Sequence, residues 1–225
     1  MLKNTGERLI LEQSWNLMTT MEHLHRYNAV TEFIKDKVIL DAACGTGYGS
    51  LLMSKSAKEV TGIDLSADAI EYARAHYHNP NLQYKNMSIT EIDLPEHSMD
   101  AIVSFETIEH VTADCQKLFL EQVSRVLKTD GVFIVSTPND QLLRDISFGN
   151  YKNEFHLCEL NETEFLNMLQ NYFPYVEIYY QTVTEVSSIV KKGIKENAGS
   201  LYSMADENTM GRYYIAVCSY APIKN

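Results

Sequence analysis

Cysteine is scarce in this chain, and its spacing forms no recognisable site. The cysteines include no Cys-x-x-Cys pair and have no histidine at the spacing of a zinc site; they are Cys44, Cys115, Cys158 and Cys218. Neither a disulfide framework nor a zinc finger is therefore expected. We expect reduced thiols and a cytoplasmic protein.

Long apolar runs are also missing. No stretch reaches the length of a membrane span, and charged residues interrupt positions 1–20, so this segment is not expected to be a signal peptide. The chain contains no Pro/Gly/Ser-rich tract and no internal repeat. Its 225 residues fit one domain, residues 1–225, around a single core.

Positive charge is in the minority. Lys and Arg number 19 against 30 Asp and Glu, which gives a formal net charge of -11, and no basic run offsets it locally. A nucleic-acid substrate would have to overcome this repulsion, because neutralised phosphates supply most of the nonspecific affinity. We expect the partner to be a small or neutral molecule, and no nucleic acid.

The chain does contain a regular alternation of two patterns. Short apolar runs rich in β-branched residues recur with amphipathic stretches between them, which is typical of an α/β fold with a parallel sheet covered on both faces. Strands are expected at residues 38–42, 59–64, 82–85, 100–105, 132–136, 176–181 and 212–220. Helices are expected at residues 9–33 (one or two), 48–56, 67–77, from Thr112 to the stop at 129–131, and 161–172.

A glycine loop follows the first expected strand. Gly45 and Gly47 lie between that strand and the next helix, where a backbone without Cβ lets a ligand approach closely. A lone Gly-x-Gly would equally suit a dinucleotide, but a dinucleotide loop would have a third glycine or alanine at position 50, where this chain has Ser50. Asp41 before the loop would repel a pyrophosphate and suits an ammonium or sulfonium. Asp64, which ends the second strand, can accept both hydroxyls of a ribose.

Four segments together resemble the class I S-adenosylmethionine (SAM) dependent methyltransferases. They are Val38–Gly49 (motif I), Thr61–Ser66 (motif II), Ser98–Val111 (motif IV with its downstream signature) and Leu127–Asn139 (the next strand), in family order over about the first two thirds of the chain. The resemblance implies a Rossmann-like sheet of seven strands, mostly parallel with an antiparallel last strand. It also implies SAM as cofactor and S-adenosylhomocysteine (SAH) as product.

The resemblance assigns roles at these positions. The loop with Ala43, Gly45 and Gly47 would pass under the methionine part of SAM, Asp41 would lie near its ammonium, Asp64 would hold the ribose, Leu65 would press on the adenine, and the backbone of Phe105 would meet the methionine end. Met87 and Ser88 would contact adenine, although this chain has Ser88 where the family commonly has Asp.

A shorter match concerns residues 5–8, 22–27 and 155–157. These segments look like a subset of the family found in bacterial surface-polysaccharide and secondary-metabolite pathways. In that subset an arginine ahead of motif I pairs with the SAM carboxylate, and Arg26 is the candidate here, because a guanidinium fork suits that group. A surface or helix-pairing role is the alternative for Arg26.

The regions divide by expected role. Residues 1–36 would form an N-terminal helical lid, residues 37–139 the SAM-binding core, and residues 140–225 the acceptor-side elements and last strands. Packing on an outer face is the alternative for the N-terminal helices. The insert at residues 182–211 is a candidate acceptor or oligomer element, and a homodimer through it is one interpretation.

The sequence offers two histidines as a general base. His110 follows the fourth strand and His156 the fifth, at the sheet edge where the methyl group must point. Each has a packing or bracing role as its alternative. Glu106 and Glu109 could bind a metal with His110, but these residue types at one turn are weak evidence, and no metal is expected.

The preferred function is O-methylation of a small polar acceptor, a sugar hydroxyl or a phosphate-type oxygen in surface-polysaccharide or related biosynthesis. N-methylation of an amino-sugar or amine is the nearest alternative. Two less favoured interpretations are an NAD-dependent nucleotide-sugar enzyme and a catalytically inert SAM-binding regulator.

Overall fold

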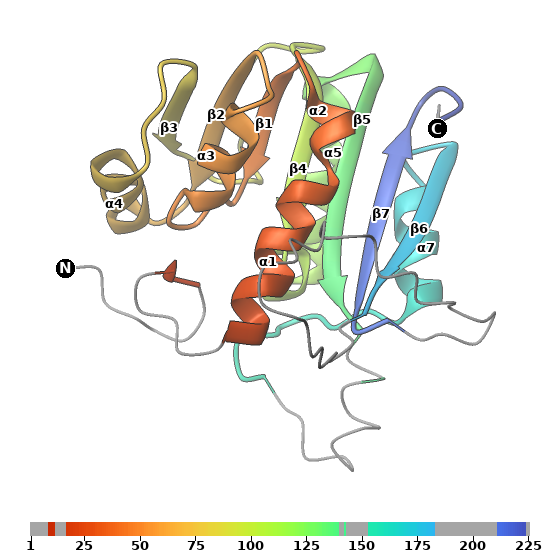
Figure 1. The fold of residues 1–225 in the computed structure, drawn as a ribbon. Coiled ribbons are helices and arrows are strands. Elements are labelled where there is room, and N and C mark those ends of the chain that lie inside the picture. The colour runs from red at the N-terminus through yellow and green to blue at the C-terminus, as the bar shows by residue number, and fades with distance from the viewer. Residues whose placement is uncertain (1–8, 12–16, 140–141, 143–152, 183–210, 224–225) are drawn as a thin grey trace, which may run out of the picture.

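The computed structural model describes residues 9–11, 17–139, 142, 153–182 and 211–223. In this part of the chain a seven-stranded sheet lies between helices (Figure 1). The strands are β1 (Val38–Ala42), β2 (Glu59–Asp64), β3 (Leu82–Asn86), β4 (Met99–Phe105), β5 (Leu127–Pro138), β6 (Tyr175–Gln181) and β7 (Tyr213–Ser219). The helices are α1 (Leu17–Ala29), α2 (Thr31–Ile34), α3 (Tyr48–Ser54), α4 (Ala67–His76), the 3-10 turn η2 (Ile108–His110), α5 (Ala113–Val126) and α7 (Glu162–Gln170).

The strand order is β3-β2-β1-β4-β5-β7-β6. Neighbouring strands from β3 to β5 are parallel, and β7 runs antiparallel to both β5 and β6. This confirms the expected Rossmann-like fold with an antiparallel last strand. The chain moves outward from β1 to β3 and then returns to place β4 beside β1, and ligands of open α/β sheets bind at such a reversal.

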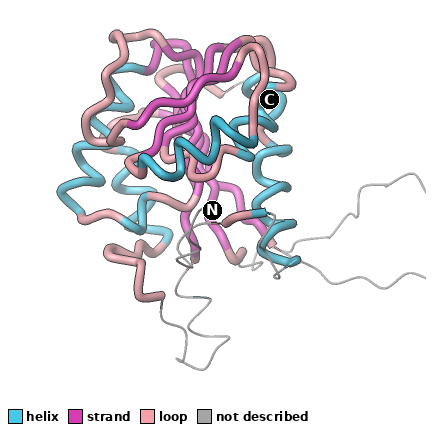
Figure 2. Tube along the Cα trace, turned by 90° about the vertical axis from the view of Figure 1, so that its left-hand side faces the viewer, coloured by secondary structure: helices cyan, strands magenta, loops and turns pink. Residues whose placement is uncertain are grey.

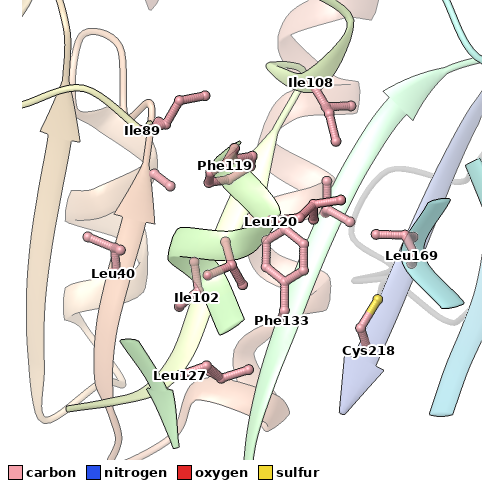
Figure 3. Close-up of a cluster of buried hydrophobic side chains, with 14 of the residues drawn as sticks. Leu40, Ile89, Ile102, Ile108, Phe119, Leu120, Leu127, Phe133, Leu169 and Cys218 are labelled. Atoms are coloured by element: carbon pink, nitrogen blue, oxygen red, sulfur yellow. The ribbon is translucent and has the colours of Figure 1, made fainter. Parts of the chain in front are cut away.

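The core has two halves, one on each face of the sheet, because successive strand side chains point to opposite faces. Ile39 and Ile134 pack with the helices α1 to α4, whereas Leu40 and Phe133 pack with α5 and α7. Figure 2 shows the strands between helices on both sides, and Figure 3 shows the half around Phe133. Covering both faces explains why the central strands β1 and β4 are mostly apolar and buried, whereas the edge strands β3 and β6 are more polar and more exposed.

Local signals set where the helices begin. The side chains of Ser66 and Thr112 accept backbone N–H bonds at the starts of α4 and α5. Asn161 and Glu164 form a reciprocal capping box at the start of α7, with both hydrogen bonds at 3.0 Å. These three helices begin within a residue of where the sequence predicts them.

One predicted boundary is wrong. We expected the helix after Thr112 to continue to residues 129–131, but α5 ends at Val126, and Leu127–Pro138 is a single strand. Leu127 is fully buried and pairs with Met99, and the register then shifts between Met99 and Ala101. Burial of Leu127 in the sheet therefore ends the helix before the Thr-Asp-Gly stop signal.

The N-terminal helices are present as expected. Helix α1 packs on the sheet face that carries α3, with Tyr27 against Phe105 at a ring-centroid distance of 5.0 Å. No residue of α1 lines the pocket described below, so the lid role stays a prediction. The insert at 182–211 lies outside the described residues except for its ends. No helix in the described ranges is long and apolar enough to cross a bilayer.

Candidate cofactor and active site

A pocket of about 420 Å³ opens at the carboxyl ends of β1, β2 and β4, where the strand order reverses. Its lining comes from the segments that end four strands: Ala43, Gly45, Asp64, Leu65, Ser66, Ile89, Glu106, Thr107, His110 and Val111. Two of these, Ala43 and Glu106, have positive φ values of 65° and 51°. Such backbone strain in residues other than glycine concentrates at functional sites.

The two glycines of the loop have different roles. Gly45 lines the pocket with φ +55°, and a Cβ on it would meet no atom within 4 Å. Gly47, with φ +91°, is away from the pocket lining, and its Cβ would lie 2.7 Å from both Ala73 Cβ and the Tyr84 hydroxyl oxygen. The Tyr84 hydroxyl donates to the Gly47 carbonyl at 2.9 Å. Gly45 therefore leaves space for a ligand, and Gly47 lets the loop pack on the protein.

Asp64 lies at the pocket and also organises the loop. Its Oδ2 accepts from the Gly45 backbone N–H at 2.9 Å, and its Oδ1 accepts from the Ser66 N–H at 2.8 Å. Each carboxylate oxygen has a second lone pair for a ligand hydroxyl. Leu65, beside it, is 76% exposed. The pair thus offers a hydrogen-bonding group and an apolar surface next to each other.

Asp41 is fully buried and does not line the pocket. Ser50 donates a hydrogen bond of 2.5 Å to its Oδ2, and Oδ1 has no hydrogen-bond partner among the described residues. Burial raises the pKa of Asp41 from 3.8 to about 7, the Ser50 hydrogen bond opposes the rise, and the charge of Asp64 adds to it. A position beside the SAM ammonium stays a prediction.

Arg26 lies in the last turn of α1, and its side chain is buried. Its Nη1 donates to Gln181 Oε1 at 3.0 Å and lies 3.5 Å from Glu106 Oε1, and its guanidinium carbon lies 4.3 Å from the centre of the Tyr213 ring. Its Nε and Nη2 have no hydrogen-bond partner among the described residues. Arg26 therefore reaches the pocket through Glu106, which lines it. A surface role for Arg26 is wrong, since the residue is 1% exposed.

Three further residues predicted to contact the adenine or the methionine end of SAM do not themselves line the pocket. Met87 packs against the core cluster, and the Ser88 hydroxyl contacts the Thr90 hydroxyl at 2.8 Å. Neither lines the pocket, whereas their neighbour Ile89 does. Phe105 is 6% exposed, and its carbonyl accepts from the Thr107 hydroxyl at 3.1 Å. Adenine contacts of Met87 and Ser88, and a backbone contact of Phe105, remain proposals.

The two candidate histidines lie together. The His110 and His156 ring centroids are 5.0 Å apart, at 82° between the ring planes. His110 lines the pocket, and its Nδ1 lies 3.0 Å from the Phe155 carbonyl oxygen. His156 does not line it, and its side chain is 3% exposed. Of the two, only His110 reaches the pocket.

Sequence reasoning missed several lining residues: Ser66, Ile89, Thr107 and Val111, and it considered Glu106 only as a metal ligand. Each lies within a few residues of a strand or loop that was singled out. Their signal was position at the carboxyl end of a parallel strand, which is where such sheets bind ligands.

Comparison with known proteins supports the interpretation of the pocket as a SAM site of a methyltransferase. Residues 39–131 match a family described as a methyltransferase domain. The chain is 33% identical over 170 residues to a protein of Mycolicibacterium smegmatis named "Probable S-adenosylmethionine-dependent methyltransferase", covering 74% of this chain and 63% of the relative. It is 30% identical over 146 residues to a ubiquinone biosynthesis O-methyltransferase of Rhodopseudomonas palustris, covering 56% of each.

Among solved structures, one from Thermotoga maritima titled "SAM-dependent methyltransferase, possible histamine N-methyltransferase" has a TM-score of 0.69 at 18% identity and covers 96% of this chain and 97% of its own. At that identity the likeness shows the fold alone. The chain spans 63% and 58% of the length of the mycobacterial relatives it matches. Residues 39–131 thus match the methyltransferase-domain family, and every residue that lines the pocket at the strand reversal lies within this range.

Proposed function

We propose that this protein transfers the methyl group of SAM to an oxygen of a small polar acceptor bound at the His110 end of the pocket. The observation that carries the proposal is the pocket at the strand reversal. It combines open space at Gly45, the Asp64 carboxylate and the exposed Leu65 with polar groups after β4.

The residues present fit the cofactor. Asp64 would accept the ribose hydroxyls, and Leu65 with Ile89 would cover the adenine. The methionine end would lie over Gly45 toward Glu106. The buried Arg26 suits the cofactor's carboxylate because two of its nitrogens lack a hydrogen-bond partner among the described residues. For a direct pairing, the contact of 3.5 Å between Arg26 and Glu106 would have to open.

SAM supplies a methyl group on a sulfonium, which becomes the neutral thioether of SAH when the methyl leaves. The acceptor oxygen would form the new C–O bond with a lone pair, the C–S electron pair would stay on sulfur, and the hydroxyl proton would pass to solvent water. The protein's own contribution is to hold the acceptor in line and to exclude water. The pocket residues that would hold the acceptor and exclude water are Thr107, His110 and Val111.

Oxygen as the acceptor atom is supported by the relative named for ubiquinone biosynthesis O-methylation. A sugar or phosphate-type oxygen in surface-polysaccharide or related biosynthesis is the proposed acceptor class, supported by the resemblance of residues 22–27 and 155–157. The net charge of -11 also favours such a molecule over a nucleic acid.

The test is calorimetric titration with SAM, SAH and NAD. Leu65→Ala removes the apolar surface, and because Leu65 is 76% exposed the fold should tolerate the change. We expect SAM and SAH to bind the wild type and to bind Leu65→Ala roughly tenfold more weakly, the cost of about 1–2 kcal/mol of lost apolar contact. Leu118→Ala, on an exposed leucine of α5 outside the pocket lining, is the matched control. Binding of NAD without any response to SAM would overturn the proposal.

A further inference from the structure

We propose that Glu109, His110 and His156 form a binding site for one divalent transition-metal ion at the acceptor end of the pocket. One ligand atom from each residue lies within 4.8 Å of the others. The inference deepens the proposed function and rests on it for the role of the ion, although the ion-binding site can be tested by itself.

Two segments of the chain supply the three residues. Glu109 and His110 belong to η2, directly after β4. The segment with His156 packs onto this turn, because the backbone N–H groups of Leu157 and Cys158 both donate to the Glu109 carbonyl, at 2.8 and 3.1 Å. A third link joins His110 Nδ1 to the Phe155 carbonyl at 3.0 Å. The side chains therefore meet on a braced backbone.

A buried glutamine strengthens the same junction. Gln116 of α5 donates through Nε2 to the Ile108 carbonyl at 2.8 Å and to the Cys158 carbonyl at 3.4 Å. It is 3% exposed. Preorganised ligands of this kind lose little conformational entropy when an ion binds.

The hydrogen bonding of His110 matches that of metal-binding histidines. A carbonyl oxygen can only accept, so the Nδ1 of His110 carries the proton, and the Nε2 lone pair points away from Phe155. Nε2 lies 3.8 Å from Glu109 Oε1. Metal-bound histidines regularly donate their other ring N–H to a backbone carbonyl in this manner.

The carboxylate and the second imidazole are also held in place. Glu109 is 0% exposed, and its Oε2 accepts from the Thr137 hydroxyl at 3.1 Å. The His156 side chain is 3% exposed, and its Nδ1 lies 4.0 Å from Glu159 Oε1. Its Nε2 accepts from Asn153 Nδ2 at 2.7 Å, so an ion bound through Nε2 would replace this hydrogen bond. A divalent cation would compensate a buried carboxylate that faces two imidazoles.

Two imidazoles and one carboxylate suit Zn²⁺, Fe²⁺ or Mn²⁺. Three protein ligands leave a coordination position open, which is typical of catalytic sites. His110 lines the pocket beside Thr107, so the open position would face the acceptor. The ion would then polarise the acceptor hydroxyl and ease its loss of a proton, while His110 and His156 would act as ligands and not as bases.

This proposal departs from the sequence-based expectation of no metal. That expectation weighed Glu106, Glu109 and His110, which share one turn. The fold brings in His156 instead and engages Glu106 elsewhere, with the Ser136 hydroxyl at 2.7 Å and Arg26 at 3.5 Å.

The experiment titrates Zn²⁺ and, separately, Mn²⁺ into the chelator-treated chain of 225 residues by calorimetry, with bound metal counted by elemental analysis. We expect about one ion per chain in the wild type. We expect Glu109→Gln and His156→Asn to bind it roughly tenfold or more weakly. His25→Ala, an exposed histidine on α1, is the matched control and should bind like the wild type.

Circular dichroism on each variant confirms that it is folded, and the near-isosteric Glu109→Gln carries the conclusion if His156→Asn unfolds. A wild type that takes up neither ion, or a folded Glu109→Gln that binds as tightly as the wild type, overturns the metal site. SAM titration of the same wild-type sample separates the two proposals. SAM binding without ion binding defeats only the metal site, and ion binding without SAM binding defeats only the proposed function.

Discussion

Asp41 provides a sharp test of the buried polar groups beneath the glycine loop. It is fully buried with a pKa raised to about 7, mainly by burial, against 3.8 for an ordinary aspartate. Below about pH 3 the carboxyl is protonated in the folded and the unfolded chain alike. As the pH rises from there towards 7, the unfolded chain releases the proton while the folded chain retains it, so the free energy of unfolding falls. The loss is complete above about pH 7.

The pKa difference of about three units corresponds to a ceiling of about 4 kcal/mol. Most of it develops between about pH 5 and pH 8, where the expected change is about 2–3 kcal/mol. Asp41→Asn keeps an oxygen that can accept the Ser50 hydrogen bond of 2.5 Å and removes the ionisation. Relative to the wild type, the variant should gain that amount of stability as the pH is raised.

The assay is urea denaturation of wild type and Asp41→Asn at about pH 5 and about pH 8. The decisive quantity is the change with pH of the stability difference, because a constant cost of inserting the amide cancels. Asp68→Asn, which removes an exposed carboxylate from α4, controls for the loss of one negative charge. If the difference between Asp41→Asn and wild type is the same at both pH values, the burial argument for Asp41 is refuted.

Two further predictions concern the glycine loop and the cap of α7. Gly47→Ala should lower the free energy of unfolding by roughly 2 kcal/mol or more in urea titrations, since its Cβ would meet atoms at 2.7 Å. Gly45→Ala should lower it by only about 1 kcal/mol, because of the φ of +55°, and should chiefly weaken SAM binding. A Gly45→Ala protein that binds SAM normally would contradict this. Asn161→Ala removes the side-chain cap of α7 and should lower the free energy of unfolding by about 1 kcal/mol, measured in the same way. No loss would show that the Asn161 cap does not contribute to stability.

Much of the fold could be predicted because its local signals agree with the tertiary structure. The runs at residues 38–42 and 59–64 form β1 and β2 with the predicted bounds, since a strand buried on both faces is continuously apolar. The caps at Ser66, Thr112 and Asn161 act within one turn of the chain, and they therefore need no tertiary contact. The end of α5 was missed because it depends on where Leu127 is buried.

The site was predictable in its strand-end positions and not in its side-chain contacts. Three of the predicted residues line the pocket, namely Gly45, Asp64 and His110, because parallel strands end at one edge. Their roles toward SAM and the acceptor stay predictions. Asp41 does not line it, since its carboxylate turns to Ser50 inside the protein. The role of Arg26 toward the SAM carboxylate stays a prediction. Its contact with Glu106 could not be foreseen, because that contact joins α1 to the turn after β4.

The sequence by itself determined the order of strands and helices along the chain, the glycine loop and the match of residues 39–131 to a methyltransferase domain, since these depend on patterns within short segments. Only the tertiary structure decided which side chains meet: it separated Gly45 from Gly47 in role, directed Glu106 to Arg26, and brought His156 to Glu109 and His110. The physical reason is that residues far apart in the chain come together only when the sheet and its covering helices pack, and sequence spacing carries no information about that distance.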